Sequence, residues 1–313
     1  MTPTNPRVSV VLPAYYSDAS IAASLDALEA QTFRDFEVIV VNSSPESRTA
    51  EIVNQRFPQV HFHQSPTRLF PHAARNVGVS LATGELIVFT DPDCVPQSDW
   101  LTVLVEASRT SSVVQGSVDV RGRGWLARGV HLCKRFSLLK GLPGYTPWIV
   151  SSINVAYSRS AWNDAGPLDG DLFCGDALLG WRAAAHGHHA VFEPRAVVEN
   201  IHDESFGGLI RQRYPRGREF AGARADYEDW SRWRAAGFAI ASPLLFAIVL
   251  LRAGRTSVAG GWASDFIMTL PVQIAGHAAW VMGETAHYAA RVVRPMRVQS
   301  RSAGGPSTVV AHD

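Results

Sequence analysis

The residues most suited to chemistry in this sequence are Asp91 and Asp93, two carboxylates in a turn stiffened by Pro92. The spacing alone is weak, because chance yields roughly one such pattern in a chain this long, and residues 169–171 contain another. The position is more informative: the pair directly follows an apolar run, and ligands of parallel sheets bind at the carboxyl ends of the strands. Two carboxylates there suit Mg²⁺ or Mn²⁺ bound to a diphosphate. The alternative is a solvated Asx turn that begins the next helix.

The elements that would position this pair form a regular pattern from Arg7 to Val120. Short β-branched runs alternate with longer amphipathic stretches, and runs that are apolar on both faces predict a mostly parallel sheet flanked by helices. We therefore predict an α/β fold, with its ligand site at the loops after the strands. The expected strands are 7–13, 37–41, 60–64 and 85–90, and the helices that follow them are 18–31, 49–57, 71–82 and 98–108.

A continuous block precedes the carboxylate pair: His72-Ala-Ala-Arg-Asn-Val-Gly78, then Ala82-Thr-Gly-Glu85 and the apolar strand. In order and spacing, this block resembles the nucleotide-sugar-binding half of family 2 glycosyltransferases of the GT-A fold, and the resemblance extends over roughly residues 8–219. It implies a Rossmann-like GT-A sheet. It also implies inverting transfer of a sugar from a nucleotide-diphosphate donor to an acceptor hydroxyl, with Mn²⁺ or Mg²⁺ as cofactor.

The resemblance also implies a donor site. Asn42 stands where the family usually has an Asp that holds the base, so the identity of the nucleotide stays open. The arginines after residue 205 resemble the region that closes over the diphosphate, although a solvated face or a contact with anionic lipid is the alternative. The donor-binding residues implied are Pro13, Ala14, Tyr15, Asn42, Arg75, Asp91, Arg213 and Arg216, and the metal-binding residues are Asp93, Asp91 and His202.

A base is needed to take the proton of the acceptor hydroxyl. Gly175-Asp-Ala-Leu-Leu-Gly-Trp-Arg182 resembles the family's ED-x-x-L-x-W-R helix start with Gly175 in place of Glu, which makes Asp176 the candidate base. The alternative is an Asp that only favours a helix N-terminus. On the acceptor side, the resemblance implies that Asn154 lines the cleft, and Trp181 could stack on a sugar ring.

Composition limits the partners and the compartment. The 313 residues are 46% hydrophobic, with 29 Lys+Arg against 28 Asp+Glu and a formal charge of +1. No chain-wide basic field exists, so we expect no nucleic-acid partner. Three widely spaced cysteines and no apolar signal segment after Met1 favour a reduced, cytosol-facing protein.

The end of the chain is different in character. Residues 235–251 contain no charge and lie between arginines, and residues 266–282 are less apolar. We expect an apolar helical hairpin that either spans the bilayer or lies on it, at the cytoplasmic face of the cell membrane. The expected division is a nucleotide-sugar half at 1–120, an acceptor half of the same domain at 121–230, a membrane-associated segment at 231–293 and a disordered tail at 294–313. A long loop is expected at 121–147.

Membrane proximity favours a glycan or lipid-linked acceptor, in envelope polysaccharide or glycolipid synthesis. Two alternatives remain. A nicotinamide-dependent oxidoreductase is disfavoured because the first loop, residues 12–17, lacks the G-x-G-x-x-G pattern. A non-catalytic membrane-associated subunit would retain the fold without the activity, and the departures at Asn42 and Gly175 keep it open.

Overall fold

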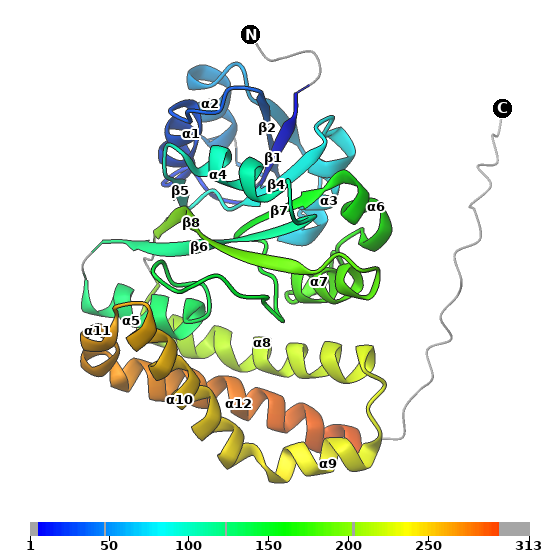
Figure 1. The fold of residues 1–313 in the computed structure, drawn as a ribbon, viewed down its shortest axis with the longest axis vertical. Helices are drawn as coiled ribbons and strands as arrows, with labels where there is room; N and C mark the ends of the chain where they lie inside the picture. Colours follow the sequence, from blue (N-terminus) through cyan, green and yellow to red (C-terminus); the bar gives the residue numbers. More distant parts are fainter. Residues whose placement is uncertain (1–5, 47, 123, 202–203, 294–313) are drawn as a thin grey trace, which may run out of the picture.

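The computed structural model describes residues 6–46, 48–122, 124–201 and 204–293. An eight-stranded sheet in the order β3-β2-β1-β4-β7-β6-β8-β5 forms the upper part of the molecule (Figure 1). Its first four strands are parallel, and β7 runs antiparallel to both of its neighbours. The strands are β1 (Val8–Ala14), β2 (Phe36–Asn42), β3 (His61–Gln64), β4 (Leu86–Thr90), β5 (Cys94–Pro96), β6 (Val113–Arg121), β7 (Asn154–Ser158) and β8 (Ala190–Ile201).

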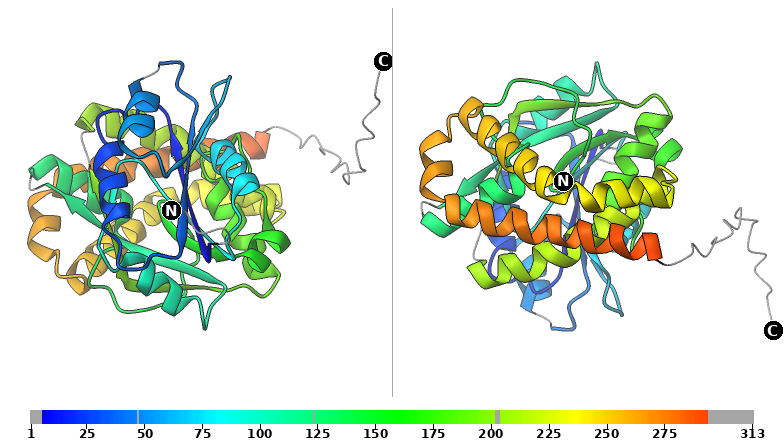
Figure 2. Two further views of the ribbon diagram at one scale, coloured as in Figure 1. Left: turned by 90° about the horizontal axis from the view of Figure 1, so that it is seen from above. Right: turned by 90° about the horizontal axis from the view of Figure 1, so that it is seen from below.

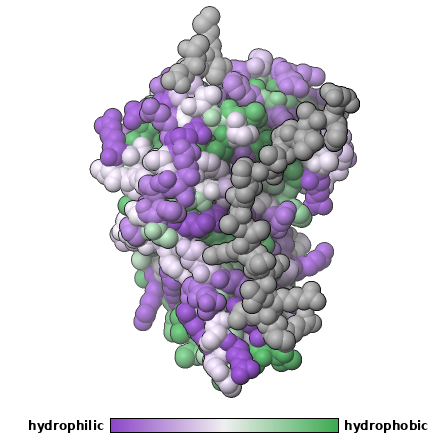
Figure 3. Space-filling model, turned by 90° about the vertical axis from the view of Figure 1, so that its right-hand side faces the viewer, coloured by the Kyte–Doolittle hydropathy of each residue, from purple (hydrophilic) through white to green (hydrophobic). Residues whose placement is uncertain are grey.

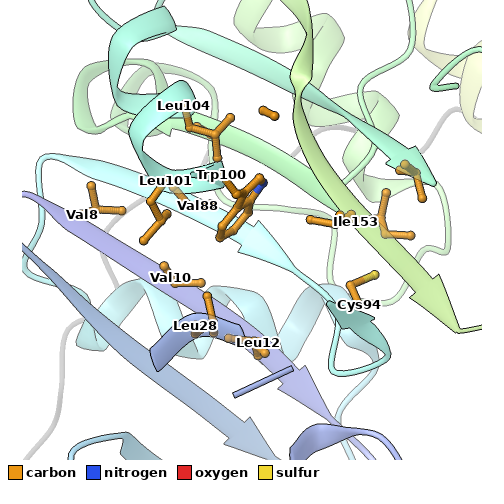
Figure 4. Packing of buried hydrophobic residues seen from close by; sticks show 14 of the residues in the cluster. Val8, Val10, Leu12, Leu28, Val88, Cys94, Trp100, Leu101, Leu104 and Ile153 are labelled. Carbon is orange, nitrogen blue, oxygen red and sulfur yellow. The ribbon is translucent and has the colours of Figure 1, made fainter. Parts of the chain in front are cut away.

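Helices cover both faces of this sheet, as predicted, because its strands are apolar on both sides. Val8, Val10 and Leu12 of β1 belong to the core on one face, whereas Val11 belongs to the core on the other. Figure 4 shows the first core, where Trp100 and Leu104 pack over β1 and β4. The helices on this first face are α1 (Ile21–Glu29), α2 (Arg48–Arg56) and α4 (Trp100–Ala107), and those on the second are α3 (Pro71–Leu81), α6 (Arg159–Ala165) and α7 (Gly175–Ala185).

The stretch expected to be a long loop contains a helix instead, α5 (Trp125–Arg135). The prediction was wrong because the helix is stabilised by segments far along the chain. A Cβ at Gly129 would lie 3.0 Å from Val272, and Gln273 donates a hydrogen bond to the Gly129 carbonyl (3.0 Å). Tertiary packing of this kind overrides a weak local signal.

The remaining helices form a layer beneath the sheet: α8 (Phe206–Tyr227), α9 (Arg232–Ile240), α10 (Ser242–Ala259), α11 (Ala263–Met268) and α12 (Leu270–Val293). Seen from below, α12 lies between α8 and the run of α9 and α10 (Figure 2). Helices α8 and α12 approach closely because glycines face backbone at their contact. A Cβ at Gly217 would lie 2.3 Å from the Trp280 carbonyl oxygen, and a Cβ at Gly283 would clash with that of Tyr214.

The two apolar stretches expected near the end of the chain have different environments. Residues 235–251 are divided between α9 and α10, with Pro243 in the first turn of α10. By length and composition alone, α10 is the one helix in the described part of the chain that could cross a membrane. Residues 266–282 extend into α12, where Val272, His277 and Val281 are buried against the body of the protein. The predicted tail, 294–313, lies outside the described residues.

Candidate active-site cleft

A cleft of about 830 Å³ opens at the carboxyl ends of β1 and β4, between the sheet and helices α5, α7 and α8. The strand pattern predicted a ligand site at this edge of the sheet, and the cleft opens there. Residues from distant segments meet in it. Its walls include Pro13 and Tyr15 after β1, Arg75 of α3, Asp91 and Asp93 after β4, Arg135 of α5, Asp176 of α7 and Arg216 of α8.

The carboxylate pair lies on the sheet side of this cleft. Ligand atoms of Asp91, Asp93 and Cys94 all lie within 4.8 Å of one another. Arg75 is almost fully buried and forms an ion pair with Asp91, and its guanidinium also donates to the Ser152 carbonyl (3.4 Å). The predicted donor residue Arg75 is therefore held against the predicted metal-binding pair.

Burial and the neighbouring Asp91 raise the pKa of Asp93 to about 6. Two adjacent carboxylates in such a place repel each other when both are ionised, and a divalent cation would remove that repulsion. Burial raises the pKa of Cys94 well above its usual value, so its sulfur is a neutral thiol. Mg²⁺ and Mn²⁺ favour oxygen ligands. The site therefore fits a hard cation, which Asp91 and Asp93 would hold.

Asn200 borders this carboxylate pair, and no sequence motif indicated it as a site residue. The antiparallel pairing of β5 with β8 places Asn200 opposite Cys94. Its amide donates to the Asp93 carbonyl (3.3 Å) and to Cys94 Sγ (3.4 Å). Nothing local in the sequence indicates this contact, because the two segments are about a hundred residues apart. His202, the predicted third metal ligand, lies outside the described residues.

Asp176 begins α7 on the opposite wall. Its Oδ2 accepts hydrogen bonds from the backbone N–H (3.0 Å) and the hydroxyl (3.4 Å) of Ser152, and Oδ1 accepts from the Ala177 N–H (2.9 Å). The helix N-terminus favours its negative charge. The side chain is one-fifth exposed, so a carboxylate of fixed orientation faces the cleft.

His72 joins the two walls. Its Nε2–H donates to the Phe173 carbonyl (3.0 Å), which leaves Nδ1 to accept from Arg75 (3.4 Å). Its Nε2 also lies 4.0 Å from Asp176 Oδ1. Burial lowers the pKa of His72, which favours this neutral ring. A chain of contacts thus links Asp91 to Arg75, His72 and the carboxylate of Asp176.

The position of His72 also explains the departure at Gly175. A Cβ there would lie 2.7 Å from the Asp169 carbonyl oxygen and 2.9 Å from His72 Cδ2. No side chain fits, so the Glu of the ED-x-x-L-x-W-R pattern has no space in this chain. The His72 ring occupies the neighbouring volume instead.

Cations line the side of the cleft formed by α5 and α8. Arg216 lies with its guanidinium 3.8 Å from the Phe173 ring centroid, and burial, with Arg135 nearby, lowers its pKa to about 10. Lys134 forms an ion pair with Glu204. Arg135, which no sequence motif indicated, has a buried Nε without a hydrogen-bond partner. The predicted Arg213 lies outside the lining, against Trp280 of α12 (4.2 Å), and donates to the Gly276 carbonyl (3.4 Å).

The loop after β1 reaches the mouth of the cleft. Pro13 and Tyr15 line it, whereas Ala14 is buried behind them. Tyr16 adopts a left-handed backbone conformation (φ 49°), which costs free energy for a residue with a Cβ and is typical of functional loops. Asn42 does not line the cleft: it is fully buried and bonds to Gln64 (2.8 Å) and Ser44 (2.8 Å).

The two residues predicted on the acceptor side, Asn154 and Trp181, do not line the cleft. Asn154 was expected to line the cleft, but it is fully buried and bonds to Trp100, Ser117 and Ala196. The preceding Ser151, Ser152 and Ile153 line the cleft instead, because Asn154 already belongs to β7. Trp181 is buried among aromatic rings, with Trp148 at 5.2 Å and Tyr227 at 5.3 Å, and lies outside the lining.

Residues 9–164 match the family model described as Glycosyl transferase family 2. This chain belongs to that family. The assignment confirms the resemblance inferred from the sequence, and with it a glycosyltransferase of the GT-A fold. It also leaves no support for the nicotinamide alternative.

Similar proteins agree with this assignment. The chain is 24% identical over 227 residues to glycosyltransferase AglE from Haloferax volcanii, covering 70% of this chain and 74% of that protein. It is 23% identical to the poly-β-1,6-N-acetyl-D-glucosamine synthase of Staphylococcus epidermidis, over 66% of this chain, and spans only about half of that protein (52%). The mannosyltransferase PcManGT from Pyrobaculum calidifontis, solved with GDP-Man and Mn²⁺, has the same fold: TM-score 0.56, 20% identity and 88% of each chain covered.

Proposed function

We propose that this glycosyltransferase moves a sugar from a nucleoside-diphosphate donor to an acceptor hydroxyl, with inversion at the anomeric carbon. The observation that supports this most directly is the arrangement of one cleft. A carboxylate pair suited to a cation lies on one wall, and a separate carboxylate, Asp176, faces the cleft from the other.

On the donor side, Asp91 and Asp93 would hold Mn²⁺ or Mg²⁺. The bound cation would act as a Lewis acid and neutralise charge on the leaving diphosphate. Arg135 and Arg216 lie on the facing wall, where their positive charge stabilises the nucleoside diphosphate as its charge develops. A structural neighbour solved with a nucleotide sugar and Mn²⁺ supports this choice of ligands.

On the acceptor side, Asp176 acts as the base. The acceptor oxygen attacks the anomeric carbon, the bond from that carbon to the diphosphate oxygen breaks, and the hydroxyl proton passes to Asp176. Ser152 and the N-terminus of α7 hold the carboxylate in one orientation, so its contribution comes from geometry. A single base on one face of the sugar is what inversion requires.

For the acceptor we propose a glycan or lipid-linked saccharide of the cell envelope. The support is the kinship with a protein named as a synthase of an N-acetyl-glucosamine polymer and the exposed apolar side chains on the C-terminal helices α9, α10 and α11. The chain covers only half of that synthase, so the proposed acceptor class rests on this exposed apolar surface as much as on the relative.

The test is calorimetric binding of UDP, GDP, dTDP and CDP, each with Mn²⁺ and with EDTA, to the wild type and to Asp93→Ala. Asp171→Ala is the matched control, because Asp171 is a cleft carboxylate outside the predicted metal pair. We expect one nucleotide to bind tightly with Mn²⁺, and EDTA or Asp93→Ala to abolish that binding while Asp171→Ala retains it.

Failure of every nucleotide to bind would favour the non-catalytic subunit. Binding that is indifferent to EDTA and to Asp93→Ala would show that the carboxylate pair is a turn without a metal. Release of free sugar from the matching donor, dependent on Mn²⁺, then establishes catalysis.

A further inference from the structure

The face formed by α9, α10 and α11 is unusually apolar for a surface. On α10, Leu244, Ile248, Leu251 and Val258 are exposed at helical spacing and form one stripe. Ile240 of α9 is 82% exposed and Ile267 of α11 is 70% exposed. Soluble monomers rarely expose apolar patches of this extent without a partner. Figure 3 shows apolar side chains at the lower end of the molecule, where these helices lie.

The same face is positively charged. Residues 231–293, all of which the structure describes, contain five arginines and two acids. Neither acid is exposed: Asp265 is paired with Arg128, and Glu284 is buried. Arg232, Arg252 and Arg255 are exposed. Arg255 lies on the apolar stripe itself, near the end of α10, where a long side chain can keep its charge at the polar boundary of a membrane.

The segments that flank α10 are fixed to the body of the protein. In α9, which leads into α10, Phe238 packs on Trp230 at 4.5 Å, and Trp230 stacks on Tyr288 of α12 (5.2 Å). Directly after α10, the Gly260 carbonyl oxygen packs against Gly141. A Cβ at position 141 would lie 2.9 Å from this oxygen, so only glycine fits there. A spanning α10 would have to leave the body along its whole length of about 27 Å. The packing of the flanking segments holds α10 along the surface of the protein instead.

We propose that α9, α10 and α11 dock the protein in the plane of an anionic membrane surface, without spanning it. Apolar side chains of the stripe enter the interface, and the exposed arginines contact lipid phosphates. The cytoplasmic leaflet, with its negative surface potential, is the surface that fits this charge. An apolar groove of about 520 Å³ between α10 and α12, with Tyr214 at its edge, adds space for lipid chains on the same side.

A second copy of the chain fits this face less well. A two-fold dimer through α10 would enclose Arg252 and Arg255 of both copies in one interface. Like charges would then face each other without an acid to offset them. Anionic lipid supplies the missing charge, and it tolerates an apolar stripe of any shape.

The helix layer also sets where the membrane lies relative to the cleft. Helix α8 contributes Gln212, Arg216 and Glu219 to the cleft and packs against α12 with its other side. Packed helices are separated by about 8–10 Å. A docked molecule therefore holds its cleft within a few helix diameters of the lipid headgroups. This position suits the lipid-linked acceptor of the proposed function, although docking itself does not depend on that function.

The experiment measures co-sedimentation of the full chain with vesicles of phosphatidylcholine alone and of phosphatidylcholine with phosphatidylglycerol. The test variant changes Leu244, Ile248 and Leu251 together to Glu. The matched control is Leu81→Glu, an exposed leucine of α3 that lies outside the cleft. We expect strong binding to the anionic vesicles only, a loss of at least about tenfold in the triple variant, and no change for Leu81→Glu.

Four further measurements make the result decisive. Retained thermal unfolding and nucleotide binding in the triple variant show that it is folded. Release of the wild type from vesicles by alkaline carbonate supports in-plane docking, whereas retention would overturn it in favour of a span. Light scattering that finds a wild-type dimer and a monomeric triple variant would overturn the proposal in favour of a second copy, and equal vesicle binding by both proteins would overturn it outright.

Discussion

At the scale of single residues, Asp176 is the group on which the proposed transfer depends most. Asp176→Asn keeps an oxygen that can accept from Ser152 but removes the base. We expect nucleotide binding to be unchanged and turnover to fall about 10²- to 10⁴-fold, measured by nucleoside-diphosphate release. Asp171→Asn, the matched cleft carboxylate, should retain activity. If Asp176→Asn stayed active, another group would have to be the base.

The raised pKa of Asp93 gives a pH dependence. The pKa of a free Asp is 3.8 and the folded metal-free value is about 6. Below pH 6, Mn²⁺ must displace a proton from Asp93, so affinity for Mn²⁺ with nucleotide should fall as pH falls, by up to about tenfold per pH unit. Calorimetry at pH 7.5 and at pH 5 measures this. A flat profile would mean that Asp93 is not a ligand.

The same shift affects stability. Because the folded pKa lies above the unfolded one, ionised Asp93 destabilises the metal-free fold at neutral pH, and that penalty declines as pH falls from about 6 to 3.8. Asp93→Asn should therefore unfold at the same or a higher temperature than the wild type at pH 7.5 in EDTA. A clearly lower unfolding temperature would contradict the burial of an ionised carboxylate.

His72 is a positioning residue, since it contacts Arg75 and lies beside Asp176. His72→Ala should lower kcat about 10- to 100-fold with little change in the donor KM. His72→Gln, whose amide can donate to the Phe173 carbonyl, should recover part of kcat. Parallel loss of kcat and of folded protein in both variants would indicate a purely structural role.

At the scale of elements, the contact of α8 with α12 depends on glycine. Gly217→Ala places a methyl group 2.3 Å from the Trp280 carbonyl oxygen, and we expect a loss of about 1–3 kcal/mol in the free energy of unfolding. Gly237→Ala in α9 is the matched control: nothing lies within 4 Å of its Cβ, and alanine should stabilise that helix by about 0.5–1 kcal/mol. Denaturant titration of both variants measures the difference, and equal effects would exclude the close approach.

At the scale of the whole molecule, the C-terminal layer packs against two helices that line the cleft. Helix α12 covers α5 and α8, which contribute Arg135 and Arg216 to the cleft. A chain ending at Glu228 should lose cooperative thermal unfolding and nucleotide binding together, because Leu209 and Phe220 become exposed. Circular dichroism and calorimetry, with the full chain as control, measure both. Full nucleotide affinity in the shortened chain would show that the layer serves only the membrane.

The sequence by itself determined the features that depend on local order. The short β-branched runs, apolar on both faces, predicted strands close to β1 to β4, and the block from His72 to Asp93 indicated the family. The carboxyl edge that these strands form is the edge where the cleft opens. These inferences succeed because continuous apolar runs and short motifs are properties of neighbouring residues.

The tertiary structure decided what depends on contacts between distant segments. It placed Asn154, Arg213 and Trp181 outside the cleft lining and brought Asn200 and Arg135 to the cleft. It also formed α5 where the local pattern indicated a loop, and it showed that the Asp169 carbonyl and His72 leave no room for a side chain at Gly175. Such outcomes follow from packing between residues far apart in the chain, which local patterns do not encode.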